Sequence, residues 1–437
     1  MSHAASTPGL PATRPLLPLS HLLKLSIYWL GINTIWGGLN SIILPSRIDA
    51  IDKANAGFLL ALINGVAVLM AIVVQPTVGM ISDYTVTRWG KRKPYIVIGA
   101  TLDVVFLFGI AASQTYLAIL AFLVLLQFSS NFAQGPFQGY VPDLVPAQQV
   151  GTASGLMGVM LVMGQIAGVG VATIGTPGNL FLATIGLGLI EFGTAIVLVT
   201  SVREGSGAPR RPGSWLKIAT SAWGTDILKE SNVLWLLLVR LLFLGAISAT
   251  NLGLFYFMRT HGLIEDDAAN LIFVATLLVG TATAAAALPG GRLSDRFGRR
   301  PMIWVACAIS AAAMLLVAIA PTAWLAIAAF VPFGIGVGIF LSVDWALMTD
   351  VIPKETTGRY MGILNAGTAA AGPVFLFVGG LVMDRVGVLD EAAGPRAAMA
   401  VAALFLVGAA IVLIRVDPTR REATVAAIEA ESAPATG

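Results

Sequence analysis

Long apolar segments alternate with short polar ones along the whole chain. Each apolar segment is long enough to cross a hydrocarbon core of ~30 Å as a helix of ~20 residues. The segments are predicted at 24–45, 56–81, 95–113, 115–141, 149–175, 179–202, 232–258, 268–290, 301–320, 322–349, 358–382 and 396–415. The pattern therefore predicts an all-α membrane protein with twelve spanning helices.

The polar segments divide the chain into two six-helix halves. The halves are predicted at 24–202 and 232–416, with a cytoplasmic linker rich in proline and glycine at 203–231. Residues 1–23 lack the apolar core of a signal peptide, so the first span is expected to act as the insertion signal. This tail and the small polar tail at 417–437 are both expected to be disordered and cytoplasmic.

Two polar motifs occur once in each half. The segment 291–301 reads Gly-Arg-Leu-Ser-Asp-Arg-Phe-Gly-Arg-Arg-Pro, a loop with four arginines, and a looser copy lies at 79–94. A second pair of motifs begins at Asp143 and at Asp350, which are 207 residues apart. Such internal repetition indicates a duplicated chain, and in a membrane protein two similar halves point first to a transporter.

Composition and charge agree with a membrane location. Hydrophobic residues make up 57% and charged residues 11% of the chain, whereas soluble domains are about 25% charged. Twenty of the 26 lysines and arginines fall in segments on one side of the predicted spans. The positive-inside rule places that side, with both termini, in the cytoplasm of a cell-membrane protein. Anionic lipids would attract these basic residues, so the charge requires no nucleic-acid partner.

Motifs of enzyme chemistry are absent from the sequence. There is no Walker-type phosphate loop, the three histidines show no metal-ligand spacing, and Cys307 is the only cysteine. No pairing of a nucleophile with a base is recognisable either. We therefore expect no enzyme activity, no cofactor and no metal site.

The repeated arginine motif resembles the signature loop of the major facilitator superfamily. The resemblance covers the chain from Lys24 to Arg415. It implies that the two loops latch the cytoplasmic side shut when the carrier faces outward, with the aspartates paired to loop arginines or to a helix N-terminus. The alternative is that the loops serve only as topogenic charge and lipid anchors. The expected gating residues are Gly79, Asp83, Arg88, Arg92, Gly291, Asp295, Arg296 and Arg299.

A narrower resemblance is to the plant-type sucrose-proton symporters and the related glycoside, pentoside and hexuronide carriers. It rests on Gln-Pro-Thr-Val-Gly at 75–79, on Asn131 with Gln-Gly-Pro at 134–136, and on Ser342-Val343. The chain departs from these symporters at Gln127, where they carry a membrane aspartate. Proton coupling is therefore not expected at that position.

The superfamily resemblance implies that spans one, four, seven and ten face a central cavity. These spans carry neutral amides and hydroxyls beside aromatic side chains, a combination that can hydrogen-bond and stack on a sugar. The alternative is that the same polar groups bridge helices within the membrane. The candidate solute-binding residues are Asn33, Trp36, Asn40, Gln127, Asn131, Gln134, Gln138, Asn251 and Trp345.

Four ionisable residues lie deep within predicted spans: Asp103, Glu191, Arg240 and Asp344. An unpaired charge at such a depth costs roughly 2.5–3.5 kcal/mol, so each residue is a candidate functional site. Arg240 and Asp344 lie at similar depths on two cavity-facing spans, which makes an ion pair and a proton-coupling device plausible. Asp103 and Glu191 are the next candidates for carrying a proton, and neutral packing is their alternative.

Together these features predict a monomeric carrier in the lipid bilayer that moves a small polar solute by alternating access. A sugar or glycoside driven by protons is the expected cargo. A proton-driven efflux antiporter for drugs or metabolites is the main alternative. A transporter-like sensor or an assembly subunit is a third.

Overall fold

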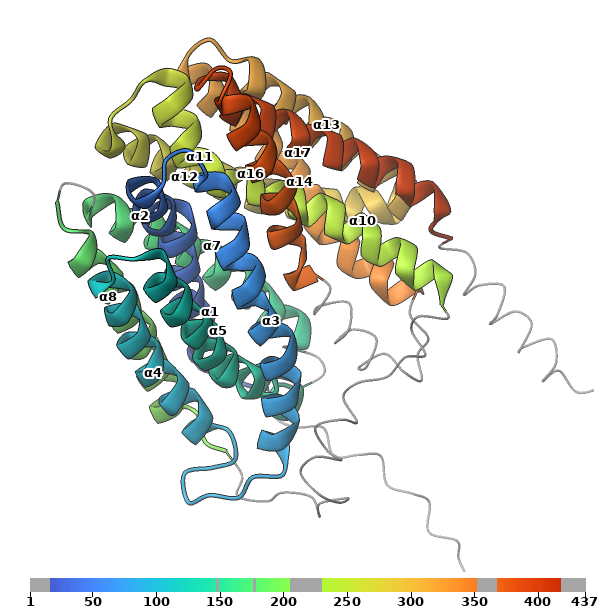
Figure 1. Ribbon diagram of the computed structural model, residues 1–437. Coiled ribbons are helices and arrows are strands. Elements are labelled where there is room, and N and C mark those ends of the chain that lie inside the picture. Colours follow the sequence, from blue (N-terminus) through green and yellow to red (C-terminus); the bar gives the residue numbers. More distant parts are fainter. Residues whose placement is uncertain (1–15, 147–148, 176–177, 205–229, 352–367, 418–437) are drawn as a thin grey trace, which may run out of the picture.

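The computed structural model describes residues 16–146, 149–175, 178–204, 230–351 and 368–417, and the elements in these ranges are all helices (Figure 1). The first half contains α1 (Leu19–Gly38), η1 (Leu39–Ile43), α2 (Leu44–Ile51), α3 (Ala56–Asp83), α4 (Lys93–Ala112), α5 (Tyr116–Gln138), α6 (Tyr140–Leu144), α7 (Val150–Gly175) and α8 (Leu180–Ser201). The second half contains α10 (Ser231–Ile247), η4 (Ser248–Leu252), α11 (Gly253–Phe255), η5 (Tyr256–Thr260), α12 (Glu265–Phe297), α13 (Arg299–Ile319), α14 (Ala323–Val351), α16 (Ala371–Gly387), α17 (Ala393–Val412) and η7 (Leu413–Arg415).

The long helices confirm the predicted all-α membrane architecture. Within the described residues, ten helical segments are long and apolar enough to cross a membrane. The other two predicted spans correspond to α1 with its continuation through η1 and α2, and to α16. These helices run alternately in opposite directions, so we call the end that contains Leu19 and Arg415 the terminal end and the opposite end the distal end.

The first and seventh spans are both interrupted near the distal end. A π-helical stretch, η1, interrupts the first span, and a 3-10 stretch, η4, followed by the π-helical η5 interrupts the seventh. Because π-helical turns leave the regular hydrogen-bond ladder, they frequently mark functional sites. Asn40 lies in η1 and Asn251 lies in η4, and these two segments contact each other across the two halves.

The arginine motif of the second half is mostly helical, which corrects the prediction of a loop there. Helix α12 continues to Phe297, and only Gly298 separates it from α13. Gly298 has a φ of 94°, a backbone conformation that side-chain-bearing residues rarely adopt. In the first half, α3 ends at Asp83 and α4 begins at Lys93, so residues 84–92 form a true connection in that copy.

Several predicted boundaries move, and others lie outside the described ranges. Helix α1 begins at Leu19, so the last part of the predicted 1–23 tail is helical. Residues 205–229 of the predicted linker and 418–437 of the predicted C-terminal tail are outside the described residues. The same holds for the part of the predicted eleventh span that precedes residue 368.

The two halves meet at the distal end and diverge toward the terminal end (Figure 1). Within the first half, α1 packs against α7 and α8, and α5 packs against α3 and α4. Between the halves, α3 contacts α16 and α7 contacts α12. Between described residues, the hydrogen bonds and ion pairs that cross from one half to the other all lie toward the distal end.

Candidate functional site

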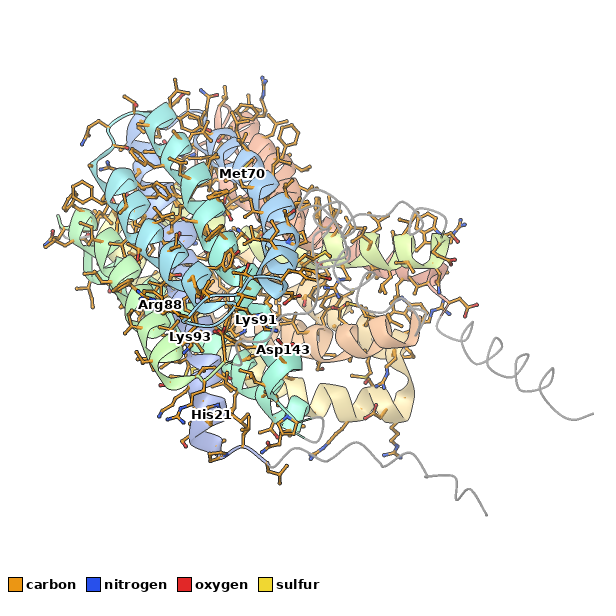
Figure 2. All side chains as sticks on the ribbon, turned by 90° about the horizontal axis from the view of Figure 1, so that it is seen from below. His21, Met70, Arg88, Lys91, Lys93 and Asp143 are labelled. Atoms are coloured by element: carbon orange, nitrogen blue, oxygen red, sulfur yellow. The ribbon has the colours of Figure 1, made fainter. Side chains whose placement is uncertain are left out.

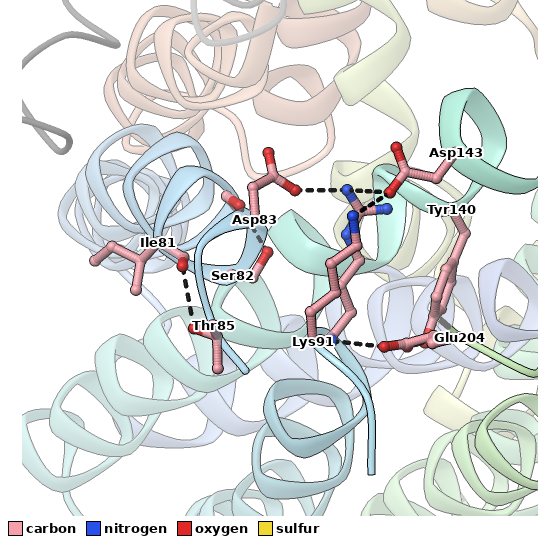
Figure 3. Close-up of polar contacts among 10 residues, drawn as sticks. Ile81, Ser82, Asp83, Thr85, Lys91, Tyr140, Asp143 and Glu204 are labelled. Atoms are coloured by element: carbon pink, nitrogen blue, oxygen red, sulfur yellow. Dashed lines mark hydrogen bonds and ion pairs between the residues drawn. The ribbon is translucent and has the colours of Figure 1, made fainter. Parts of the chain in front are cut away.

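A charge cluster closes the terminal end of the first half (Figure 3). Arg92 lies at the start of α4 with a buried side chain, and its guanidinium is 2.6 Å from Asp83 and 3.1 Å from Asp143. Lys91 also contacts Asp143, at 2.6 Å, and the backbone N–H of Arg92 donates to Glu204 at 2.9 Å. Charge-assisted bonds of this kind are stronger than neutral ones, so the cluster ties the ends of α3, α4, α6 and α8 together.

The view from the terminal end shows how this basic surface is arranged (Figure 2). Arg88, Lys91 and Lys93 lie on one side of Asp143 in this view, and Lys91 contacts it. Arg88 itself lies over the Trp89 ring, 6.0 Å from its centre. Of the predicted gating residues in this half, Asp83 and Arg92 therefore contact each other, and Arg88 does not join them in the described contacts.

The corresponding residues of the second half form a smaller and more exposed cluster. Arg299 donates to Asp295 at 2.5 Å and to the Ser294 hydroxyl at 2.6 Å, while Arg296 lies over Phe297. The predicted pairing of aspartate with loop arginine is thus present in both halves. Each of these two pairs lies within its own half.

The glycines that open these motifs are not the points of closest helix contact. A Cβ on Gly79 would lie 3.4 Å from the Gly135 carbonyl oxygen, and one on Gly291 would lie 3.9 Å from Ser342 Cβ. Two nearby glycines leave less room for a side chain. A Cβ on Gly135, which faces Gly79, would lie 2.3 Å from the Gln75 carbonyl oxygen, and a Cβ on Gly290 would lie 3.0 Å from Ile339 Cα. The helices therefore approach each other more closely at Gly135 and Gly290 than at Gly79 and Gly291.

A cap that joins the two halves lies at the distal end. Asp384, near the end of α16, accepts hydrogen bonds from the backbone N–H groups of Gly57 and Phe58, at 3.1 and 2.7 Å. These N–H groups belong to the first turn of α3. N–H groups in a first turn have no hydrogen-bond acceptor within their own helix, and the positive end of the helix dipole lies there. A carboxylate of one half thus caps a spanning helix of the other.

Further polar contacts surround this cap. Ser46 donates to Glu265 at 2.6 Å, and Arg259 pairs with Asp49 across the halves. Lys53 lies 2.6 Å from Glu391, and this hydrogen bond lowers the pKa of the Glu391 carboxyl. Because Lys53 and Glu391 are both more than half exposed, their ion pair stabilises the closed distal end only slightly. The buried Asp384 cap stabilises the closed distal end more.

The cap depends on a close backbone contact between Gly57 and Gly380. A Cβ on Gly380 would lie 2.5 Å from the carbonyl oxygen of Gly57, which is too close for any side chain. We expect Gly380→Ala to separate α3 from α16 and to increase labelling, by a small thiol reagent, of a cysteine introduced at the distal end in a Cys307→Ala background. Gly65→Ala is the matched control, since a Cβ at that position in α3 meets nothing within 4 Å. Equal labelling of the two variants would show that this contact does not hold the distal end closed.

The candidate solute-binding residues are placed on the first, fourth and seventh spans. Asn131 is buried and donates to Gln127 within α5, to its carbonyl at 2.8 Å and to its side-chain oxygen at 3.0 Å. Asn33 likewise donates to the Trp29 carbonyl of its own helix, at 2.8 Å. These bonds do not bridge helices, which disfavours a role as interhelical links for Asn33 and Asn131. The side chain of Trp345 is outside what the structure describes.

The other candidate solute-binding residues differ in their exposure to solvent. Gln127 and Gln134 are half-buried, Gln138 is exposed, and Trp36, Asn40 and Asn251 are half-buried. The Asn40 side-chain oxygen is fully buried and accepts no hydrogen bond from any described residue. A buried acceptor without a donor costs about 1–3 kcal/mol, so Asn40 is a position where a polar ligand group or water would be stabilised.

Arg240 and Asp344 form a buried ion pair in the second half. The Arg240 guanidinium lies 2.5 Å from Asp344, and both side chains are at most 4% exposed. Arg240 also donates to the Thr368 hydroxyl, at 3.0 and 3.2 Å, and contacts the sulfur of Met348. The structure therefore brings together the two residues whose contact the sequence made plausible, and it adds Thr368, which the sequence did not indicate.

Asp103 and Glu191 are also brought together, in the core of the first half. The two acids lie on α4 and α8, which pack against each other, and their carboxyl groups interact electrostatically. Tyr28 donates to Glu191 at 2.7 Å, and the Ser129 hydroxyl donates to Asp103. All four side chains are fully buried. The sequence placed the two acids on separate spans and did not indicate their contact, nor the roles of Tyr28, Ser129 and Asp384.

The family of the chain follows from comparison of its sequence. It matches the Major Facilitator Superfamily at residues 25–280 and again at 264–436. The fold described above, with two six-helix halves, is that of a multi-pass transporter of this class. The chain therefore belongs to the major facilitator superfamily.

Named relatives include transporters of sugars. A lactose permease of Leuconostoc lactis is 25% identical over 278 residues, which are 55% of this chain and 43% of that protein. A sucrose transport protein of Oryza sativa subsp. japonica is 33% identical over 122 residues, 23% of each chain. This chain thus matches less than half of the length of either relative. The relationship to sugar transporters that the motifs indicated is confirmed.

Solved structures share the fold at low sequence identity. The nucleoside transporter NupG, in a D323A mutant, has a TM-score of 0.74 at 13% identity and covers 91% of this chain and 99% of its own. A bacterial homologue of the human lysosomal transporter Spinster, in an inward-facing conformation, scores 0.70 at 15% identity, covering 91% of this chain and 96% of its own. A D-xylose-proton symporter scores 0.62 at 18% identity, with coverage of 88% and 95%. At these identities the likeness concerns the fold alone.

Proposed function

We propose that this protein is a proton-coupled carrier of a sugar or glycoside, which works as a monomer in the cell membrane with both termini in the cytoplasm. The observation that carries the solute class is the group of neutral amides on α5, whose described hydrogen bonds stay within that helix. The names of the lactose and sucrose transporters among its relatives support the same class. The excess of basic residues at the terminal end supports a cytoplasmic location for that end.

The arrangement of the two halves corresponds, in this proposal, to an inward-facing carrier. Asp384, Gly57 and Gly380 hold the outer end closed, and between described residues the Asp83–Arg92 and Asp295–Arg299 pairs each form within one half at the cytoplasmic end. In the outward-facing state the two arginine motifs would approach each other and latch the cytoplasmic end. The two halves at 24–202 and 232–416 would then move as the rigid bodies of alternating access, connected by the linker at 203–231.

Coupling to protons is assigned to Arg240 and Asp344. In the structure they neutralise each other, and an arginine keeps its charge under all physiological conditions. Protonation of Asp344 would therefore release Arg240 and loosen the contact between α10 and α14. The pair would be broken in one state of the cycle and formed in another, which is the property that a coupling site requires.

A thermal-shift screen tests the solute class. Purified protein is heated with sugars, glycosides, nucleosides and hydrophobic cations in turn. Only the true ligand class stabilises the folded state by mass action, by about 2.7 kcal/mol at a concentration of 100 Kd. Stabilisation by sugars or glycosides alone is the expected result. Stabilisation by hydrophobic cations instead would identify an efflux carrier, and a protein that binds a partner but transports no solute would be a sensor or an assembly subunit.

The α5 amides provide the corresponding mutational prediction. We expect Gln127→Ala, Asn131→Ala and Gln134→Ala each to weaken binding of the sugar by about 1 kcal/mol or more, the scale of one lost hydrogen bond. Binding is measured by isothermal calorimetry on the purified variants. Asn270→Ala, which removes an exposed amide from α12, is the control and should bind normally. Normal binding by all three α5 variants would move the solute site away from this helix.

A further inference from the structure

A group of buried polar side chains crosses four helices of the first half, separate from the Arg240 pair. Tyr28 comes from α1, Glu191 from α8, Asp103 from α4 and Ser129 from α5, and each side chain is fully buried. Gly31 lies one turn after Tyr28, and a Cβ there would be 2.8 Å from Glu191 Cα. The close approach of α1 to α8 leaves no room for a side chain between Gly31 and Glu191.

The hydrogen bonds of this group leave the two acids short of donors. The Tyr28 hydroxyl donates to Glu191 Oε1, and the Ser129 hydroxyl donates to Asp103 Oδ1. The second oxygens, Glu191 Oε2 and Asp103 Oδ2, are buried and receive no hydrogen bond from the described residues. Two carboxylates supply only acceptors, so the contact between these acids becomes a hydrogen bond only when one of them carries a proton.

No basic side chain of the described residues compensates the charge of these acids. Among the described residues, the side chains that donate hydrogen bonds to them are Tyr28 and Ser129, and neither is a cation. Two adjacent buried carboxylates without a cation would repel each other and lose their hydration, and shared protonation removes one of the two charges. The Arg240–Asp344 pair is different, because there a cation already balances the carboxylate.

We propose that Asp103 and Glu191 form a proton-binding site of the first half, in which the two carboxyl groups hold one proton that exchanges with water as the carrier changes conformation. Glu191 lies ten residues before the end of α8 and Asp103 ten residues after the start of α4. At 1.5 Å per residue both are roughly 15 Å from the terminal end, close to the middle of a ~30 Å hydrocarbon core. The site goes beyond the proposed function, because it requires neither a sugar nor coupling through Asp344.

Tyr28 and Ser129 connect this site to the predicted solute pathway. They belong to the first and fourth spans, which also carry the candidate solute-binding residues Asn33 and Asn131. Movement of α1 or α5 would change the hydrogen bonds that the two acids receive. The site is therefore positioned to gain or lose its proton when those helices move.

Infrared spectroscopy of the full chain in liposomes tests the site without any sugar. The wild type should show the C=O stretching band of a protonated carboxyl at neutral pH, and the band should move to lower wavenumber in D2O. Asp103→Asn and Glu191→Gln should each abolish it, because a single remaining carboxylate can accept from the new amide. Asp344→Asn is the matched control and should keep the band, since Asp344 is paired with Arg240.

Two further variants provide a test that does not depend on correct folding of Asp103→Asn and Glu191→Gln. Tyr28→Phe and Ser129→Ala keep both carboxyl groups, so each should retain the band and shift its wavenumber by removing one donor. Absence of the band in the wild type, or its persistence in both acid variants, would overturn the site. A band that does not shift in D2O would show that the proton never exchanges with water, and this result would also overturn the proposal. Failure of sugar binding would leave all of these results unaffected.

Discussion

Asp384→Asn should open the distal end of the carrier. The substitution keeps the size of the side chain but removes the charge that faces the N-terminus of α3, where Asp384 accepts from Gly57 and Phe58. Hydrogen bonds to a charged group contribute about 1.5–3 kcal/mol, so the equilibrium should shift by about 10- to 150-fold toward states with the distal end open. No other single contact across the halves combines a buried carboxylate with a helix terminus in the described residues.

Distance measurements between spin labels can detect this opening. Labels at Ala54 and Leu389, which are both exposed and belong to different halves, report the separation of the distal ends in a Cys307→Ala background. Asp384→Asn should add a population with longer distances. Asp267→Asn removes another carboxylate at the same end, an exposed one in the first turn of α12, and should leave the distribution unchanged. Identical distributions for both variants and the wild type would exclude Asp384 as the distal latch.

Removal of Arg240 alone should destabilise the protein more than removal of both members of the ion pair. Arg240→Ala leaves Asp344 buried without a cation, and breaking a buried pair in this way costs about 3–5 kcal/mol. The double variant Arg240→Ala/Asp344→Ala leaves no buried charge and should lose less. Thermal unfolding in detergent measures the difference. A double variant at least as unstable as Arg240→Ala would show that the pair contributes through packing and not through charge balance.

Transport assays separate the coupling role of this pair from its structural role. Asp344→Asn should lose proton-driven accumulation of the sugar while it retains exchange of sugar across the membrane, because exchange needs no net proton movement. Both are measured in proteoliposomes with an imposed pH gradient. Accumulation by Asp344→Asn would place the coupling proton elsewhere, and the pair of Asp103 and Glu191 would be the next site to test.

The sequence alone determined the architecture and indicated one buried ion pair, that of Arg240 with Asp344. The lengths and positions of the apolar segments decide the spanning helices, since a lipid environment permits few alternatives to a helix of about 20 residues. Repeated motifs identified the two halves, and equal depth made the contact of Arg240 with Asp344 plausible. These features are local or depend only on counting residues along regular helices, which is why they can be read without a structure.

Only the tertiary structure decided which side chains meet between helices. Depth along a helix does not specify the direction in which a residue faces, so the contact between Asp103 and Glu191 could not be predicted from their positions. The cap of Asp384 on α3 joins residues 326 and 327 positions apart, and it exists only in one arrangement of the two halves. States of one chain that differ in this arrangement are separated by only a few kcal/mol. All of these states have the same sequence, so the sequence pattern does not distinguish between them.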